Sequence, residues 1–179
     1  MKFDDAFELV VGAEGDYSKD PRDKGNWTGG APNKGQLLGT KYGISAKSYG
    51  LKLQALGKTI EFLCLSDAKQ IYKIDFWGAL KCDLVPSTHA YPLFSCGVNC
   101  GVSAAIKLYQ EALQVKVDGV LGPQTIRAAI ESTDPKEVLG RFCDAWAQYY
   151  KRLAKDEPAQ GIYLQGWLKR IKEVKKKNY

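Results

Sequence analysis

The sequence lacks long hydrophobic runs, and its first residues do not resemble a signal peptide. No apolar segment approaches the roughly 18 consecutive residues that a membrane-spanning helix needs, so we expect no stable membrane insertion. The opening residues MKFDDAFELVV carry two aspartates where a signal peptide has its basic segment. We therefore expect a soluble product of the cytoplasm, for which a substrate outside the cytoplasm requires a separate release or export system.

The chain is also poor in metal ligands, since His89 is its only histidine and its five cysteines follow no repeating pattern. A single histidine excludes a two-histidine metal centre. Cys96 and Cys100 stand four residues apart, with Cys82 nearby, but this spacing matches no common zinc motif. Free cysteines usually behave as small buried apolar residues, and an odd, scattered set does not indicate a disulfide framework. We expect neither a metal nor a cofactor.

What the sequence does have is an excess of positive charge. The formal net charge is +6 and the isoelectric point about 9.0, which favours anionic partners such as nucleic acid, membrane surfaces or envelope polymers. Basic residues crowd positions 169–177. They fit either a solvated helix end or a tail that holds the protein on an anionic surface. No nucleic-acid-binding motif accompanies them, so we expect no nucleic-acid partner.

Apolar residues spaced three or four apart predict a mainly α protein. Strand patterns are scarce. Residues 16–43 are rich in Gly, Asp, Asn, Thr and Pro, which indicates a loop or hairpin, and long ordered loops usually carry function. We expect a small β element near residues 16–44. The predicted helices cover residues 3–11, 45–49, 66–80, 90–113, 124–131, 134–154 and 164–177.

Glu14 follows the apolar stripe of the first predicted helix, at its C-terminal end. The helix dipole and partial burial both disfavour an ionised carboxylate there, so we expect its pKa to be raised. A raised pKa suits a general acid that protonates a glycosidic oxygen near neutral pH. Taken alone the position is weak evidence, because a glutamate at a helix end is usually a solvated surface group.

A second group of oxygen ligands follows within the loop. Asp16, Asp20 and Asp23 lie close together in the sequence, and the loop ends in Thr40–Ile44. Glycoside cleavage needs a second oxygen group that holds a water or stabilises positive charge at the sugar. Aspartates in such clusters more often bond nearby backbone amides in turns. Spacing alone therefore favours structural turns over catalysis.

Taken in order, these segments resemble the N-terminal signature of family 108 glycoside hydrolases. They are Glu14–Tyr17, Asp20-Pro21, Asp23 and Thr40–Ile44. Members of the family are N-acetylmuramidases, found as phage endolysins and as export-associated muramidases. The resemblance implies a lysozyme-like helical fold and bacteriolytic cleavage of cell-wall peptidoglycan, in the periplasm or after release through a holin-like or dedicated export system.

The second half of the chain is similar to the peptidoglycan-binding region predicted for these enzymes. The matching segments are Val98–Gly101, Val117–Thr125 and Gly166–Arg170. The resemblance implies a muramidase catalytic region over residues 1–90 and a helical peptidoglycan-binding region over residues 91–179. We expect the two to pack as one compact unit that acts as a monomer on glycan strands.

By resemblance, Glu14 is the general acid that cleaves the β-1,4 bond between N-acetylmuramic acid and N-acetylglucosamine. Asp23 and Thr40 orient a water or stabilise the oxocarbenium-like transition state. The sequence departs from the family pattern in three places, one of which is Ser95-Cys96 before the Val98–Gly101 segment. Asp16 replaces a glycine, and the stretch 25–39 is longer than the short form of the pattern. Thr28 therefore remains an alternative to Thr40.

Four residues are predicted to contact substrate: Asp20, Trp27, Tyr42 and Asn99. Trp27 and Tyr42 lie in the loop beside the predicted acid, where aromatic rings can stack on sugars. Two alternatives stay open. A non-catalytic peptidoglycan-binding protein would keep the fold without activity, and a lytic transglycosylase would use one acid on a similar scaffold but produce anhydro ends.

Overall fold

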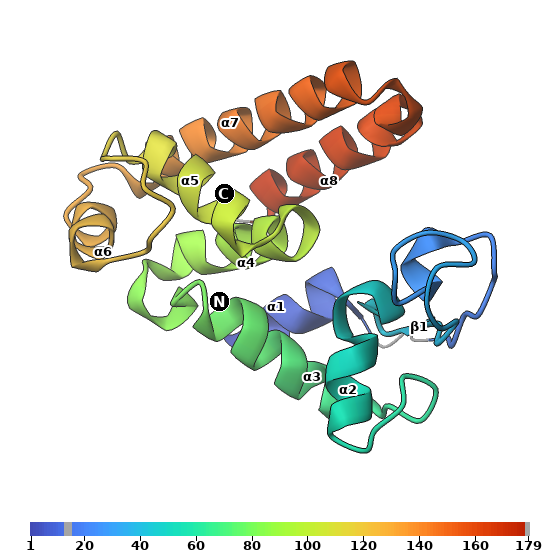
Figure 1. The fold of residues 1–179 in the computed structure, drawn as a ribbon. Helices are drawn as coiled ribbons and strands as arrows, with labels where there is room; N and C mark the ends of the chain where they lie inside the picture. Colours follow the sequence, from blue (N-terminus) through green and yellow to red (C-terminus); the bar gives the residue numbers. More distant parts are fainter. Residues whose placement is uncertain (13–15, 178–179) are drawn as a thin grey trace. The chain divides into compact units, whose positions relative to one another are not determined.

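The computed structural model describes residues 1–12 and 16–177. The chain divides into two compact units, one formed by Phe7–Tyr72 and the other by Met1–Ala6 with Lys73–Tyr179. The described residues are mainly helical and form a single two-stranded antiparallel sheet, which confirms the mainly α, lysozyme-like fold with a small β element (Figure 1). No helix in these ranges is long and apolar enough to cross a membrane.

The smaller unit contains the loop that was predicted to carry the chemistry. Its aromatic core includes Phe7 and Tyr72, whose rings meet edge to face with centroids 5.6 Å apart. Both come from helices whose apolar spacing predicted them. The elements are α1 (Phe3–Val10, which starts in the other unit), a 3₁₀ turn (Lys24–Asn26), β1 (Thr40–Lys41), β2 (Ile44–Ser45), a π-helical turn (Ala46–Gly50), α2 (Leu51–Ala55) and α3 (Leu65–Tyr72).

Strands β1 and β2 are joined by the two-residue turn Tyr42-Gly43. Both residues have positive φ, 50° and 74°, as a type I′ hairpin turn requires. Gly43 is also confined by its neighbour, because a Cβ there would collide with the hydroxyl of Tyr72. Backbone geometry therefore explains the glycine within the Thr40–Ile44 segment.

The larger unit is a helical assembly in which α4, α5, α7 and α8 pack on one another. Trp77 and Trp146 are fully buried in it, while Trp167 is half-buried and stacks on Tyr150 with ring centroids 4.6 Å apart. Its elements are a π-helical turn (Lys73–Gly78), a 3₁₀ turn (Cys82–Leu84), α4 (Ser87–Cys100), α5 (Val102–Ala112), α6 (Pro123–Ile130), α7 (Pro135–Asp156), a 3₁₀ segment (Pro158–Tyr163) and α8 (Leu164–Lys176).

One helix prediction was wrong. The sequence predicted a continuous helix over residues 90–113, but α4 ends at Cys100 and α5 begins at Val102. Gly101 between them has φ 88° and ψ 151°, outside the helical region, so the chain changes direction there. The apolar spacing continues across the break because both helices bury a face in the same core.

Candidate functional site

The predicted acid, Glu14, lies outside the described residues, as do Ala13 and Gly15. Asp16, the next residue that the structure describes, is exposed. The other predicted site residues divide between the two units. Asp20, Asp23, Trp27, Thr40 and Tyr42 belong to the unit Phe7–Tyr72, whereas Asn99 belongs to the other unit.

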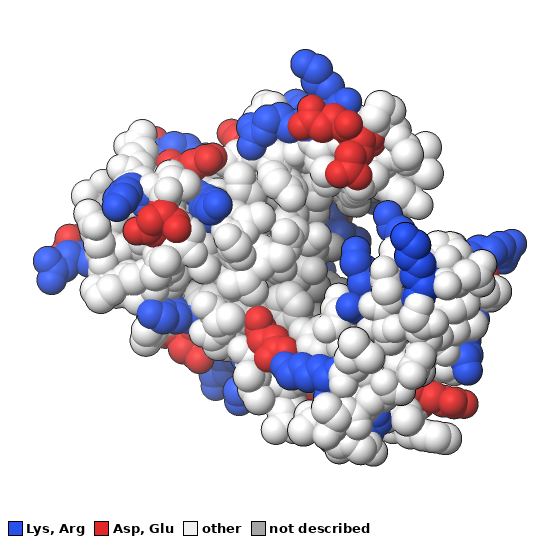
Figure 2. Space-filling view, viewed as in Figure 1, with Lys and Arg blue, Asp and Glu red and all other residues white. Residues whose placement is uncertain are grey.

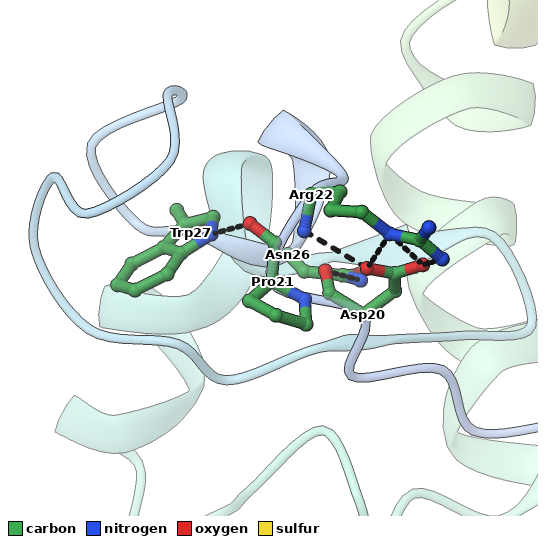
Figure 3. Close-up of polar contacts among 5 residues, drawn as sticks. All are labelled: Asp20, Pro21, Arg22, Asn26 and Trp27. Atoms are coloured by element: carbon green, nitrogen blue, oxygen red, sulfur yellow. Dashed lines mark hydrogen bonds and ion pairs between the residues drawn. The ribbon is translucent and has the colours of Figure 1, made fainter.

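A residue that the sequence did not single out, Asn26, holds the loop together. Its side chain is fully buried, and its Nδ2 donates to the carbonyl of Asp20 at 3.0 Å (Figure 3). Its backbone N–H donates to the carbonyl of Asp23, and its own carbonyl accepts from the N–H groups of Leu38 and Gly39, at 3.0 and 3.1 Å. Asn26 thereby ties the segment containing Asp20 and Asp23 to the segment that leads into Thr40.

Asp23 is exposed and caps the short 3₁₀ turn that follows it. Its Oδ1 accepts from the backbone N–H of Gly25 at 2.8 Å. Asp23 therefore forms the side-chain to backbone hydrogen bond of a turn that the sequence predicted for these aspartates. Among the described residues nothing donates to its second oxygen, which leaves one carboxylate oxygen for another partner. The catalytic role of Asp23 remains a prediction.

Asp20 is held by Arg22 in a two-pronged ion pair. Arg22 donates through Nε to Oδ1 at 3.0 Å and through Nη2 to Oδ2 at 2.7 Å, and its backbone N–H donates to Oδ1 at 2.9 Å (Figure 3). These bonds lower the pKa of Asp20 to about 2. Asp20 is therefore ionised at neutral pH, and in its predicted substrate contact it can only accept hydrogen bonds.

The two candidate threonines differ in what their hydroxyls do. The Oγ1 of Thr28 accepts from the backbone N–H of Gln36 at 2.9 Å, which closes the loop between them. Thr40 lies in β1 and is half-buried, and its backbone pairs with Ser18 through bonds of 2.9 and 2.8 Å. Within the described part of the chain, its hydroxyl has no partner. This difference favours Thr40, whose role stays a prediction.

Trp27 and Tyr42, the two aromatic residues predicted to stack on sugars, are both half-buried. Trp27 donates from Nε1 to the carbonyl of Pro21 at 2.8 Å (Figure 3). Tyr42 sits in the hairpin turn, with Lys41 Nζ 5.6 Å from its ring centroid and its carbonyl bonded to the Tyr72 hydroxyl. Both rings are partly exposed and offer apolar surface of the kind that stacks on sugars, and the Trp27 ring is also held by its hydrogen bond. Their contact with substrate remains a prediction.

A small cavity of about 110 Å³ lies on the same unit, lined among others by Tyr17, Leu38 and Glu61. The Tyr17 hydroxyl donates to the carbonyl of Leu38 at 3.2 Å. Burial and, less strongly, the Glu61 carboxylate raise the pKa of Tyr17. Glu61 is a further carboxylate of this unit that sequence spacing did not identify, because it lies in an irregular segment far from the loop in sequence.

Asn99 lies at the end of α4 and is exposed. Its Nδ2 donates to the carbonyl of Ser95 at 2.7 Å, and its Oδ1 accepts from Arg170 of α8. Asn99 thus links the C-terminal turn of α4 to α8. This structural role accounts for its place in the Val98–Gly101 motif, while its predicted contact with substrate remains untested.

The Val117–Thr125 motif is organised by a second buried amide, Gln110 of α5. Its Nε2 donates to Asp118 Oδ1 at 2.8 Å, to the carbonyl of Val120 at 3.0 Å and to Thr125 Oγ1 at 3.2 Å. Its Oε1 accepts from the backbone N–H groups of Asp118 and Gly119, at 3.1 and 2.8 Å. The Val117–Thr125 segment, which resembles a peptidoglycan-binding region, is therefore a loop and the first turn of α6, both fastened to α5.

The described residues hold no group of three or more His, Cys, Asp or Glu side chains placed to bind a metal ion. His89 is buried, with Nδ1 2.7 Å from the Tyr109 hydroxyl and Nε2 2.8 Å from the carbonyl of Pro135. Burial lowers the pKa of His89 below its usual value. Both ring nitrogens are thus engaged in the core of the larger unit.

The net positive charge is mixed with acidic groups at the surface. On the face drawn in Figure 2, acidic and basic side chains both gather over α7 and the turn that follows it. The charge therefore does not form one continuous basic patch over those elements, and local groupings decide what each surface attracts.

Comparison with known proteins identifies the two halves of the chain. The family described as "Glycosyl hydrolase 108" matches residues 7–101, and the family described as "Predicted Peptidoglycan domain" matches residues 104–172. The structure is similar to one described as "Structure of Brucella abortus SagA", with a TM-score of 0.75 and 22% identity over 98% of this chain and 92% of that one. At that identity the likeness shows a shared fold. A search of curated proteins finds no match. Because the first family covers more than half of the chain, this protein belongs to the glycosyl hydrolase 108 family and is a glycoside hydrolase that acts on peptidoglycan.

Proposed function

We propose that the protein is a muramidase, which hydrolyses the β-1,4 bond between N-acetylmuramic acid and N-acetylglucosamine. Glu14 is the general acid that protonates the oxygen between the two sugars. The observation that carries the proposal is the glycosyl hydrolase 108 match over residues 7–101, which contains Glu14, Asp23 and Thr40 in the order of the family signature.

Asp23 and Thr40 supply the second oxygen group that glycoside hydrolysis requires. The geometry of the loop supports this role in two ways. The hydrogen bonds of Asn26 tie the two segments that carry these residues. Among the described residues, one carboxylate oxygen of Asp23 and the hydroxyl of Thr40 are also left without partners. A water held between such fixed groups needs little reorganisation during the reaction.

Trp27 and Tyr42 provide apolar ring surface to the sugars, and Asp20 accepts hydrogen bonds from sugar hydroxyls or amides. Asn99 contributes from the C-terminal turn of α4. The enzyme meets its substrate in the periplasm or after release from the cell, by a holin-like or dedicated export route. It serves there either in phage lysis or in protein secretion.

The test is mass spectrometry of the fragments released from purified Gram-negative peptidoglycan by wild type and Glu14→Gln. We expect reducing N-acetylmuramic acid ends from wild type, and a rate lower by about 10² to 10⁴ for the variant, because a positioned general acid contributes that much. Anhydro ends would assign the protein to the transglycosylases. A lack of fragments from both proteins would leave a wall-binding module.

The second carboxylate is tested in the same assay with Asp23→Asn, and Asp16→Asn serves as its matched control. Both residues are exposed aspartates of one loop, so the two variants change charge equally. We expect Asp23→Asn to lower the rate at least about tenfold and Asp16→Asn to retain it. Equal rates for the two variants would remove Asp23 from the mechanism.

A further inference from the structure

A groove of about 480 Å³ lies along α7 and α8, within the larger unit. Its apolar lining includes Ala147 of α7 with Leu168 and Ile171 of α8. The volume falls within the range of roughly 300–1,000 Å³ that is typical of ligand pockets. The groove is therefore large enough to hold a short peptide.

The polar lining of this groove is strongly basic. It contains four lysines and a single acid, Asp144. Lys151, Lys169 and Lys172 are exposed, and in the described ranges none of the three forms an ion pair. An ammonium group is a donor without acceptor capacity, so three lysines around one concavity favour a ligand with several anionic oxygens.

We propose that this groove binds the carboxylates of the peptide stems that peptidoglycan carries on its muramic acid residues. The stems are short peptides that combine free carboxylates with alanine methyl groups. Carboxylates complement Lys151, Lys169 and Lys172, and the methyl groups complement the apolar lining. Most of the groove also falls within residues 104–172, which match the predicted peptidoglycan domain.

The inference rests on the proposed function, because it assigns to the larger unit the peptide part of a strand whose sugar backbone is cut by residues of the smaller unit. It also separates this groove from a general affinity for anionic surfaces. A flat membrane or an extended polyanion would be met by charges spread over a face, whereas these lysines surround a concavity with an apolar lining.

The experiment uses the full-length wild-type protein. Binding is measured without turnover, because a muropeptide built on a single N-acetylglucosaminyl-N-acetylmuramic acid unit lacks the bond that the enzyme is proposed to cut. Isothermal titration calorimetry compares a disaccharide-tetrapeptide muropeptide with the same disaccharide lacking the peptide. The groove variant is Lys169→Gln/Lys172→Gln. The matched control is Lys176→Gln/Lys177→Gln, which removes the same charge from exposed positions at the end of α8 outside the groove. Thermal unfolding of each variant verifies that it is folded.

We expect the groove variant to raise the Kd for the muropeptide about tenfold or more, since charge-assisted hydrogen bonds are lost, and the control to leave it unchanged. Binding of the peptide-free disaccharide should be the same in all the proteins. Added salt should weaken muropeptide binding by wild type more than by the groove variant.

Other outcomes would overturn the proposal. These are an absence of muropeptide binding by wild type, equal losses in the groove and control variants, or an equal loss with the peptide-free disaccharide. Vesicles of anionic phospholipid serve as a second probe. If the groove variant lost binding to these vesicles but kept its binding to the muropeptide, the groove would be assigned to a membrane surface. Failure of the proposed function gives a different result. If muropeptide binding depended on the lysines but the wild-type protein released no fragments from peptidoglycan, the groove proposal would stand and the muramidase proposal would be wrong.

Discussion

Two loops, one in each unit, are organised by a buried side-chain amide, and they differ in how completely that amide is used. Gln110 makes five hydrogen bonds to the loop at residues 118–125, three as donor and two as acceptor. Asn26 makes one side-chain bond, to the carbonyl of Asp20. Its Oδ1 is buried and has no partner among the described residues. The other bonds that Asn26 makes within its loop come from its backbone.

The two loops therefore differ in how many of the hydrogen bonds that hold them come from the amide side chain. In the Gln110 loop, Asp118 Oδ1 accepts from both Gln110 Nε2 and the N–H of Val120, so this oxygen helps to hold the turn. In the Asn26 loop, the backbone is fixed while Asp23 and Thr40 keep unbonded oxygens in the described structure. Under the proposed function, the loop held by Asn26 carries the chemistry, whereas the loop held by Gln110 is a scaffold.

The largest effect on stability should come from Gln110→Ala. The substitution removes a partner from the buried Thr125 and the half-buried Gly119, and from Asp118 and Val120, which are exposed. Each unsatisfied group costs about 1–3 kcal/mol, and water can reach some of them, so we expect a loss of roughly 3 kcal/mol in the free energy of unfolding. Urea denaturation measures it.

Gln124→Ala is the matched control, because Gln124 is an exposed glutamine close to the same loop. It should change stability by less than about 0.5 kcal/mol. A Gln110→Ala protein as stable as this control would mean that water replaces the amide and that the loop needs no fastening.

The sequence predicted the fold better than it predicted these amides. Helices with clear start signals were placed well. Pro123 begins α6, and Asp134 caps α7 by accepting from the N–H groups of Lys136 and Glu137. The break at Gly101 was missed, because the apolar spacing on its two sides looks continuous and a single glycine does not by itself indicate a helix end.

Asn26 could not be identified from sequence, since a buried amide in an irregular loop leaves no periodic pattern. Nor could the sequence distinguish Thr28 from Thr40, because the partner of a hydroxyl depends on how the loop folds back on itself. The roles of Glu14, Asp23 and Asn99 came from family resemblance and remain predictions. Local patterns thus specify helices and turns, whereas the contacts that hold a site together depend on tertiary structure.

A substitution in the Asn26 loop should cost less stability than Gln110→Ala but more enzymatic activity. Asn26→Ala removes one hydrogen bond together with an unsatisfied oxygen, so we expect it to cost only about 1 kcal/mol. Its activity on purified peptidoglycan should nevertheless fall about tenfold, because the segment that carries Asp20 and Asp23 loses its side-chain bond to Asn26 and is held less precisely. Gln110→Ala, assayed at a temperature where it is folded, should keep its activity. If activity instead followed stability in both variants, the loops would not differ in role.

The smallest effect concerns the two aspartates whose pKa values the loops lower. Arg22 lowers the pKa of Asp20 to about 2, and the pKa of Asp118 is lowered chiefly by the Gln110 amide. A carboxyl whose pKa is lower in the folded state binds fewer protons than in the unfolded chain. The stabilisation of the folded protein by each carboxylate is therefore complete above pH 3.8, the ordinary pKa of the group. It is lost as the pH falls through the pKa of the folded state.

Salt should distinguish the two aspartates, because one partner is an exposed cation and the other a neutral amide. Raising sodium chloride to about 1 M shortens the Debye length to roughly 3 Å, which weakens attraction between exposed charges. Carboxyl-carbon NMR titrations should then show the pKa of Asp20 rising towards 3.8 while that of Asp118 moves less, since Lys116 makes only a smaller contribution to it. Arg22→Gln should raise the pKa of Asp20 and remove its salt dependence, and Gln110→Ala should raise that of Asp118. Equal salt shifts for both would mean that charge, and not the buried amide, holds the Gln110 loop.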